Sequence, residues 1–491
     1  MKRLKSMGMW IKKHKVITLI ILCAAFLRMW RLGDFAMFLA DQGRDAIIIK
    51  RIVMLEHFPL IGPPSSIGQV YLGPFFYYLV APFLFLFGLN PVGLAFGVSL
   101  LSIVGIVIGY FVVQKALNEK IALVFLVLSA FSYQLIWMAR FSWNPNLLPV
   151  FAFFTLYFLY KALETKKIVY SALYGAFFAL SFQLHHLAAF LGAPIAISFI
   201  YAFMKEKKKV MLLSSPFIAI AAFLLISSPL IIFDFKHDFL NTKNLISLFT
   251  QQNVVAGGSP LARLLETNHA FWTAIFQKSY APQHSIILSA IFIAILTFVW
   301  IKKGKNLFIL IHAINIFSFV YLFSILSSAR HPHYYGSIYL SFFVICAYLL
   351  GSIPKKAYST ALLGFIISLY IALNAKQFSF LTSQSNNQIV YAERIAKSIA
   401  PYIDKKPFNF ATYPIEFTSE DTFLYFLEKQ GLKAANREAK EVTDQMYVLC
   451  DREPCRILDS HSWNIEMFGE AKIDTMWEVS GVKIYRLIHE K

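Results

Sequence analysis

The sequence predicts an all-α polytopic membrane protein with about eleven transmembrane helices and a small C-terminal extracytoplasmic α/β domain. Of its 491 residues, 58% are hydrophobic and only 15% are charged, whereas soluble domains carry about 25% charged residues. Apolar runs of roughly 17–25 residues, long enough to cross a bilayer, recur through the first three quarters of the chain. Because backbone polar groups in lipid must be satisfied within a segment, we expect these runs to be helices.

The positive charge of the chain has the distribution expected of a membrane protein. The net charge of +19 would suit a nucleic-acid partner, but lysine and arginine are concentrated in short loops between apolar runs, as the positive-inside rule expects. We therefore predict membrane lipids and no nucleic acid as partners, with every basic cluster in the cytoplasm. These clusters occupy residues 2–15, 115–120, 161–167, 205–209, 302–305 and 355–356.

The loops fix a topology for the predicted spans. From a cytoplasmic N-terminus, all the basic clusters fall inside, and the segments at 31–91, 140–146, 234–284, 327–335 and after 374 fall outside. The first run has basic flanks and no small-residue cleavage site, so we expect it to be retained in the plasma (inner) membrane. The predicted spans are 16–32, 92–113, 121–139, 147–162, 169–186, 188–204, 210–233, 285–301, 306–326, 336–353 and 357–374.

One apolar run, at residues 71–88, does not fit this topology. If it crossed the membrane fully, the later basic clusters would lie outside. Its sequence YLGPFFYYLVAPFLFLFG contains two prolines and many aromatic residues, which favour the membrane–water interface. We therefore predict a re-entrant or interfacial segment within a long first outer loop, with an ordinary span as the alternative by length alone.

The chain changes character after residue 374. Helical periodicity marks residues 386–402 and 419–431, and residues 408–413, 445–449 and 482–487 resemble short strands. We predict a transmembrane domain over 1–374 and an extracytoplasmic α/β domain over 375–491. Cys450 and Cys455 can pair as a disulfide in an oxidising compartment. A zinc site needs further ligands, and the chain contains no CxxC pair, so we do not expect a metal site.

The most informative motif follows the first predicted span. Residues 39–45 read LADQGRD and place Asp41, Arg44 and Asp45 beside the membrane. Charged groups at this depth are costly and usually mark a functional site. Asp45 is four residues from Asp41, so both lie on one face if the stretch is helical.

These features together resemble glycosyltransferase family 39 and its relatives, the protein O-mannosyltransferases and the bacterial lipid A aminoarabinose transferases. The resemblance rests on the basic first span, the acid-and-arginine motif at 39–45 and the aromatic run at 71–88. Asp41 matches the leading Asp of the family motif and Arg44 its Arg. Gln42 stands where the family usually has Glu, which is a departure. The layout extends to about residue 374, and the resemblance implies a GT-C fold.

The resemblance also implies a reaction. A sugar on a polyprenyl phosphate is the donor, and a hydroxyl on an unknown glycan, lipid or protein is the acceptor. The transfer inverts the anomeric centre and needs no metal or other cofactor. Asp41 is then the candidate general base, since a placed carboxylate can take the proton of the attacking hydroxyl, and Asp45 is a second catalytic candidate.

Without a metal ion, protein cations must stabilise the departing phosphate. The candidates lie on the same predicted face as Asp41, and arginine suits phosphate because its fork can bind two oxygens. They are Arg44, Arg140, Arg330, His331 and His333, and further pocket candidates are His185, His186, Tyr71 and Tyr334.

Structural interpretations remain open beside each of these roles. Asp41 can cap a helix, Arg44 can neutralise the two acids, and Arg140 can anchor its span at the headgroups. At the level of the whole protein, the alternatives are a lipid-linked sugar transporter and a non-catalytic scaffold. Transporters usually show internal repeats and polar residues at mid-membrane, whereas here the charges gather at the outer rim and no repeat is visible.

Overall fold

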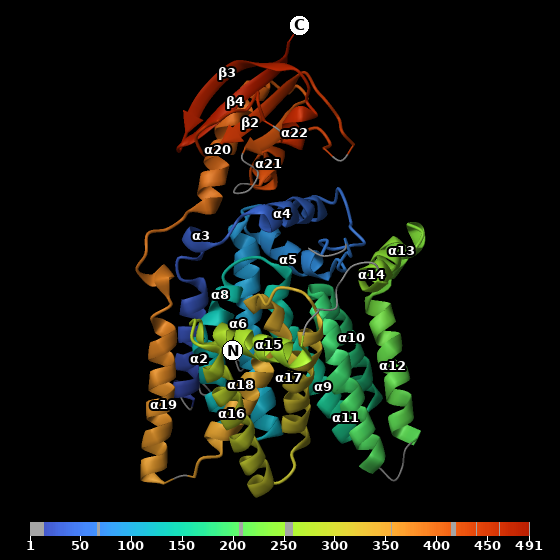
Figure 1. Cartoon of the computed structure of the whole chain (residues 1–491), viewed down its shortest axis with the longest axis vertical. Helices are drawn as coiled ribbons and strands as arrows, with labels where there is room; N and C mark the ends of the chain where they lie inside the picture. The colour runs from blue at the N-terminus through green and yellow to red at the C-terminus, as the bar shows by residue number, and fades with distance from the viewer. Residues whose placement is uncertain are drawn as a thin grey trace, which may run out of the picture.

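A computed structural model describes residues 14–65, 69–205, 210–250, 259–354, 356–413, 419–437, 439–460 and 462–490. A helical bundle forms most of the molecule, and a sheet domain built from the end of the chain covers one end of the bundle (Figure 1). This arrangement confirms the predicted fold class. Much of the predicted basic cluster at 2–15, most of 205–209 and Lys355 fall outside the described residues.

Every predicted span is helical. Seven helices of the described part are long and apolar enough to cross a membrane, or up to nine if each of two bent pairs is one span. The shorter α2 and α10 account for the remaining predictions. The bounds are α2 Lys15–Met29, α6 Val92–Ala116, α9 Leu148–Thr165, α10 Ile168–Leu184, α11 Gly192–Lys205, α16 Pro282–Lys303, α17 Leu307–Ile325, α18 Gly336–Gly351 and α19 Ala357–Ala375.

Two predicted spans are broken, which the sequence analysis did not foresee. The segment 121–139 divides into α7 Glu119–Phe131 and α8 Tyr133–Ala139, bent by 59°. The Ser132 side chain accepts from the backbone N–H of Leu135 and so begins a new helix. The segment 210–233 divides into α12 Val210–Ile226 and α13 Ser228–Lys236, bent by 62°, and a proline in the first turn of α13 explains the break.

In the described residues of the first outer loop there are short helices and no helix long enough to be a further span. These are α3 Leu32–Phe35, α4 Ala40–Val53 and α5 Phe75–Leu86. The apolar run at 71–88 becomes α5, and its 12 residues extend about 18 Å, short of the roughly 30 Å hydrocarbon core. This length agrees with the predicted interfacial or re-entrant segment.

The predicted outer loop at 234–284 is largely helical, which we did not expect. It holds α14 Leu240–Thr250 and α15 Pro260–Phe276. Phe271 and Trp272 of α15 are buried against Phe342 of α18. This segment is therefore part of the packed bundle.

The C-terminal unit is a four-stranded sheet with helices against it. The strand order is β1-β2-β4-β3, with β1 and β2 parallel and the other pairs antiparallel. The predicted helices and strands are all present, but β3 was missed. The bounds are α20 Gln388–Ile403, β1 Asn409–Tyr413, α21 Glu420–Lys429, β2 Gln445–Cys450, α22 Trp463–Glu466, β3 Ala471–Val479 and β4 Val482–His489. Cys450 and Cys455 form a disulfide.

The sheet domain shares its core with the bundle. One hydrophobic cluster runs from Leu84 of α5 through Ile49 of α4 to Phe423 of α21 and Tyr447 of β2. The connection between α16 and α17, which carries Lys302–Lys305, lies at the opposite end of the bundle from the sheet domain (Figure 1).

Candidate active site

The motif at 39–45 folds into the first turns of α4, and its sequence explains why a helix begins there. The Gln42 side-chain oxygen accepts from the backbone N–H of Leu39 at 3.2 Å, which satisfies a donor that the helix start leaves free. Asp41 lies in the first turn, and Lys50 and Arg51 lie in the last. Both placements complement the helix dipole. Gln42, the departure from the family motif, therefore has a capping role that a glutamate would also fill.

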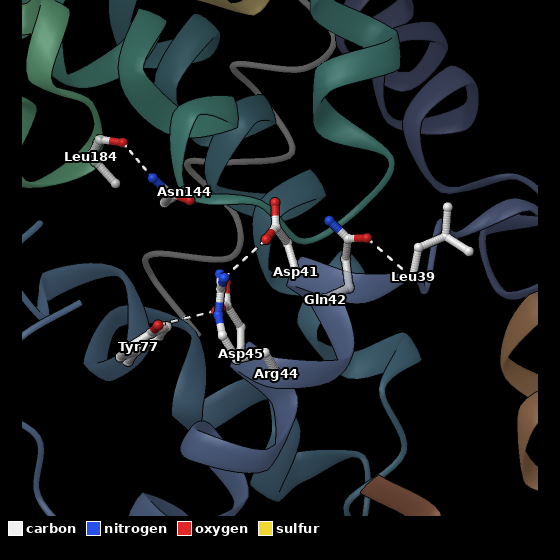
Figure 2. A network of polar contacts seen from close by, with 8 residues as sticks. All are labelled: Leu39, Asp41, Gln42, Arg44, Asp45, Tyr77, Asn144 and Leu184. Carbon is white, nitrogen blue, oxygen red and sulfur yellow. Dashed lines mark hydrogen bonds and ion pairs between the residues drawn. The ribbon is translucent and has the colours of Figure 1, made fainter. Parts of the chain in front are cut away.

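Arg44 joins the two acids of the motif (Figure 2). Its Nη1 lies 2.9 Å from Asp41 Oδ1, and its Nη2 lies 2.8 Å from Asp45 Oδ1. The Tyr77 hydroxyl of α5 donates to the same Asp45 oxygen at 3.0 Å. The two carboxylates differ sharply in exposure, because the Asp41 side chain is 43% exposed and that of Asp45 is 1% exposed.

The electrostatics follow from this difference. Burial raises the pKa of Asp45 to about 6, although Arg44 opposes the shift. Burial disfavours the charge of Arg44, but Asp45, Tyr77 and Asp41 outweigh it and raise the pKa of Arg44 above its ordinary value. Asp45 Oδ2 is buried and has no hydrogen-bond partner among the described residues. Asp45 therefore holds Arg44 in place, and Asp41 presents a carboxylate to the surroundings.

Helix α21 of the sheet domain lies directly on α4. A Cβ added to Gly43 would meet the backbone nitrogen of Thr422 at 2.6 Å, so only glycine allows this approach. Asp421 lies close enough to feel the charges of Arg44 and Asp41, and burial raises its pKa. Helix α21 was not among the elements predicted to form the site. The glycine between the two acids was the available signal, since a glycine in a helix often marks a close backbone approach.

The last turn of α4 is also held by α21. Glu428 lies 3.0 Å from Lys50 Nζ and 2.5 Å from an Arg51 nitrogen. The Lys50 and Glu428 side chains are only 7% and 10% exposed. This buried ion pair attaches the sheet domain to the helix that carries the acid motif.

Several predicted residues come together in a second group, the histidine–tyrosine cluster, defined here as His185, His331, His333 and Tyr334. The ring centroids of His333 and Tyr334 are 4.4 Å apart, and those of His185 and Tyr334 are 5.2 Å apart. His331 stacks on His333 with centroids 5.6 Å apart. The ring of Trp143, which the sequence analysis did not select, lies 4.4 Å from that of His333.

Two chain neighbours of this cluster are joined by a hydrogen bond. Asn144 donates to the carbonyl of Leu184 at 2.7 Å. In the view of Figure 2, both residues lie on the side of α4 from which the Asp41 carboxylate projects. They are the chain neighbours of Trp143 and His185. The chain thus connects the cluster directly to residues on the side of α4 from which the Asp41 carboxylate projects.

The other two predicted arginines make structural contacts. Arg140 donates to the carbonyls of Leu27 and Trp30 at the end of α2 and stacks 3.8 Å above the Phe380 ring. Arg330 donates to the carbonyls of Leu326 and Ser328 after α17. These contacts give both arginines a structural role, and phosphate binding by them stays a prediction.

Tyr71 and His186 link the first outer loop to the bundle. The His186 ring hydrogen-bonds to the backbone of Tyr71, and the Tyr71 N–H donates to the side-chain oxygen of Asn241 of α14 at 2.7 Å. Both residues therefore hold the loop that precedes α5. These contacts do not involve the acid motif, so a role of Tyr71 or His186 in the site stays a prediction.

The fold of this chain is similar to those of solved membrane proteins. The ArnT protein of Cupriavidus metallidurans matches in its apo state with a TM-score of 0.64 and 11% identity, over 97% of this chain and 98% of that chain. The structure of the same protein bound to undecaprenyl phosphate matches with a TM-score of 0.62 and 11% identity, with the same coverage. The fold of this chain is thus the GT-C fold of membrane glycosyltransferases.

Two further comparisons agree with this fold. The archaeal oligosaccharyltransferase AglB from Archaeoglobus fulgidus, solved with an inhibitory peptide and a dolichol-phosphate, matches with a TM-score of 0.53 and 14% identity, over 90% of this chain and 70% of that chain. Residues 72–233 match the family model of the dolichyl-phosphate-mannose-protein mannosyltransferases. The motif at 39–45 precedes that segment. No curated protein sequence matches the chain.

Proposed function

We propose that this protein is a membrane glycosyltransferase that moves a sugar from a polyprenyl-phosphate donor to an acceptor hydroxyl at the extracytoplasmic surface. The observation that carries the proposal is the open carboxylate of Asp41 in the first turn of α4, within a GT-C fold. The undecaprenyl phosphate in the ArnT structure and the dolichol-phosphate in the AglB structure support a polyprenyl-phosphate donor.

The proposed reaction is a single displacement. The acceptor hydroxyl gives its proton to the Asp41 carboxylate while its oxygen forms a bond to the anomeric carbon of the donor. The bond from that carbon to the phosphate oxygen breaks, and the electron pair leaves with the lipid phosphate. Attack and departure on opposite sides of the carbon invert its configuration. Proton transfer to a placed base contributes roughly 10²–10⁴ in rate.

The leaving phosphate needs positive charge or hydrogen-bond donors in place before the reaction. Arg44 is the strongest candidate, because its guanidinium lies beside Asp41 and its side chain is 28% exposed. His331 and His333 supply donors from the histidine–tyrosine cluster. Buried Asp45 fixes the orientation of Arg44 through two hydrogen bonds to one oxygen. In this proposal, no metal ion takes part.

The proposed localisation is the plasma (inner) membrane, with the N-terminus in the cytoplasm and the sheet domain outside. Its support is the basic loop at 302–305, which lies at the opposite end of the bundle from the sheet domain. The acceptor is a glycan, a lipid or a protein, and the sheet domain that lies on α4 is placed to take part in its selection.

A direct assay tests this function. The purified protein is given a synthetic polyprenyl-phosphate sugar, and the release of free polyprenyl phosphate is measured together with transport of the donor across vesicles. An enzyme releases polyprenyl phosphate, and Asp41→Asn abolishes most of the release. Transport of the donor without release of polyprenyl phosphate would indicate a transporter instead. Equal release by the wild-type protein and by Asp41→Asn would show that Asp41 is not the base.

A further inference from the structure

A cavity of about 390 Å³ lies away from the acid motif, between the end of α15, the start of α16 and the end of α19. Its size falls at the low end of the range of small-molecule sites, roughly 300–1,000 Å³. None of the residues that line it belongs to the acid motif or to the histidine–tyrosine cluster. Nothing described above therefore accounts for it.

The mouth of the cavity is basic. Lys278, His284 and Lys376 line it, and all three side chains are exposed. The amide of Gln377 adds a further donor. No acidic residue is among the residues that line the cavity. Its charge therefore complements an anion.

The walls of the cavity are apolar and belong to helices that face lipid. Ile287 and Leu373 line it. Among its described residues, α19 buries only Ser359, and α16 buries only Ser285 and Leu296. Two long apolar helices with so little buried surface are expected to have hydrocarbon chains against them. An apolar slot with a basic mouth at a helix end is the chemistry that holds a phosphate-headed lipid.

The cavity also adjoins the connection to the sheet domain. Its residue Asn374 accepts from the backbone N–H of Tyr133 at the start of α8. A few residues further on, the carbonyls of Phe380 and Ser383 accept from Arg31. A lipid in the cavity would contact the end of α19, where the connection to the sheet domain begins.

We infer that this cavity binds one anionic glycerophospholipid, with its phosphate at Lys278 and Lys376 and one acyl chain along Ile287 and Leu373. The site is separate from the proposed donor site, so its test does not depend on glycosyl transfer. A bound lipid at this position would stabilise the folded protein by mass action.

The test compares lipid retention by native mass spectrometry after addition of equal amounts of phosphatidylglycerol and phosphatidylcholine. The protein should retain phosphatidylglycerol preferentially. Lys278→Glu combined with Lys376→Glu should weaken that retention by about tenfold or more, since two charge-assisted contacts are lost. The matched control is Lys405→Glu with Lys406→Glu, which reverses two exposed charges on the sheet domain and should leave retention unchanged.

Other outcomes overturn the inference. Equal retention of phosphatidylglycerol by the Lys278 and Lys376 variant would reject the site. Preferential retention of a polyprenyl phosphate would reject a glycerophospholipid, and displacement by millimolar inorganic phosphate would indicate a site for the free anion. If the double variant does not fold, Leu373→Trp provides the second test, because it fills the apolar slot without changing charge and should also reduce retention.

Discussion

The two ends of α4 differ in how far their charged side chains are buried against the rest of the molecule. In the last turn, Lys50 and Arg51 converge on Glu428 of α21, and the Lys50 side chain is 7% exposed. In the first turn, Asp41 is paired with Arg44 and yet is 43% exposed. The fold holds one end of the helix firmly and leaves a charged group accessible at the other end.

The difference shows how a reactive carboxylate can be positioned and still be reached. A group that acts on a substrate must keep its geometry before the substrate arrives. Here the positional constraint comes from the buried neighbours of Asp41, namely Asp45 below it, Gly43 against α21 and the ion pair at the far end. Asp41 is the exposed group, and its buried neighbours fix its position. Substitution of Asp41 should therefore affect activity, whereas substitution of the residues that hold α4 should affect stability.

The largest expected effect concerns the open end. Asp41→Asn should lower the rate of polyprenyl-phosphate release by roughly 10²–10⁴, because the amide cannot accept the proton. Donor binding should change little. Single-turnover kinetics measure both quantities, and Asp34→Asn is the matched control, since Asp34 is a similarly exposed acid paired with Arg31. A loss of similar size in the control would mean that the assay reports folding.

At the closed end, Glu428→Ala should lower the free energy of unfolding by about 3–5 kcal/mol, because it leaves a buried lysine unpaired. The measurement is chemical unfolding in detergent, monitored by a spectroscopic signal from the sheet domain. Glu393→Ala removes an acid of similar size from the more exposed pair with Lys397 and should cost less than about 1 kcal/mol. Equal costs would show that the α4–α21 contact does not hold the domains together.

Asp45 gives a prediction about pH. Burial raises its pKa in the folded protein to about 6, above the ordinary value near 3.9 of an unfolded chain. Between these values, the folded state binds more protons than the unfolded state, so the contribution of Asp45 to stability is greatest below pH 4 and declines until about pH 6. The stability of the protein relative to Asp45→Asn should therefore fall by up to about 3 kcal/mol over this window. A constant difference from pH 4 to pH 7 would contradict the burial of an ionised Asp45.

The smallest expected effect separates the two peripheral arginines. Arg330→Ala should weaken donor binding more than Arg140→Ala does, by a factor of about five at most. Arg330 adjoins the histidine–tyrosine cluster in the chain, whereas Arg140 is buried under the end of α2. A donor titration of both variants measures this. No change for Arg330→Ala would reject its role at the phosphate.

Much of the fold could be predicted from the sequence, because a long apolar segment in lipid must satisfy its own backbone hydrogen bonds and therefore forms a helix. Apolar length predicted the spans. The parity of the basic loops predicted an interfacial or re-entrant segment at 71–88, and α5 there has only 12 residues. The bends at Ser132 and before α13 were missed, because the average hydrophobicity of a segment hardly changes when one serine caps a helix or one proline breaks it. Strand β3 was missed because most of its side chains are partly or fully exposed and a bulge interrupts its register.

The candidate site was predicted only in part, for a physical reason. Local spacing predicted that Asp41 and Asp45 share a helix face if the stretch is helical, and both lie in α4, where Arg44 bridges them. The partner of buried Asp45 is Tyr77 of α5, and the neighbour of Gly43 is Thr422 of α21, which is more than three hundred residues away in the chain. Contacts at that separation leave no periodic trace in the sequence. The same holds for the carbonyls that occupy Arg140.

The central claim is that Asp41 stands where the acceptor hydroxyl arrives. A structure of the protein with a non-hydrolysable polyprenyl-phosphate sugar and an acceptor analogue would test it most directly. We predict that an Asp41 oxygen lies within about 3.2 Å of the acceptor hydroxyl, with the donor phosphate against Arg44 or the histidine–tyrosine cluster. A donor bound with its anomeric carbon remote from α4, and Asp41 still facing only water and Arg44, would contradict the account.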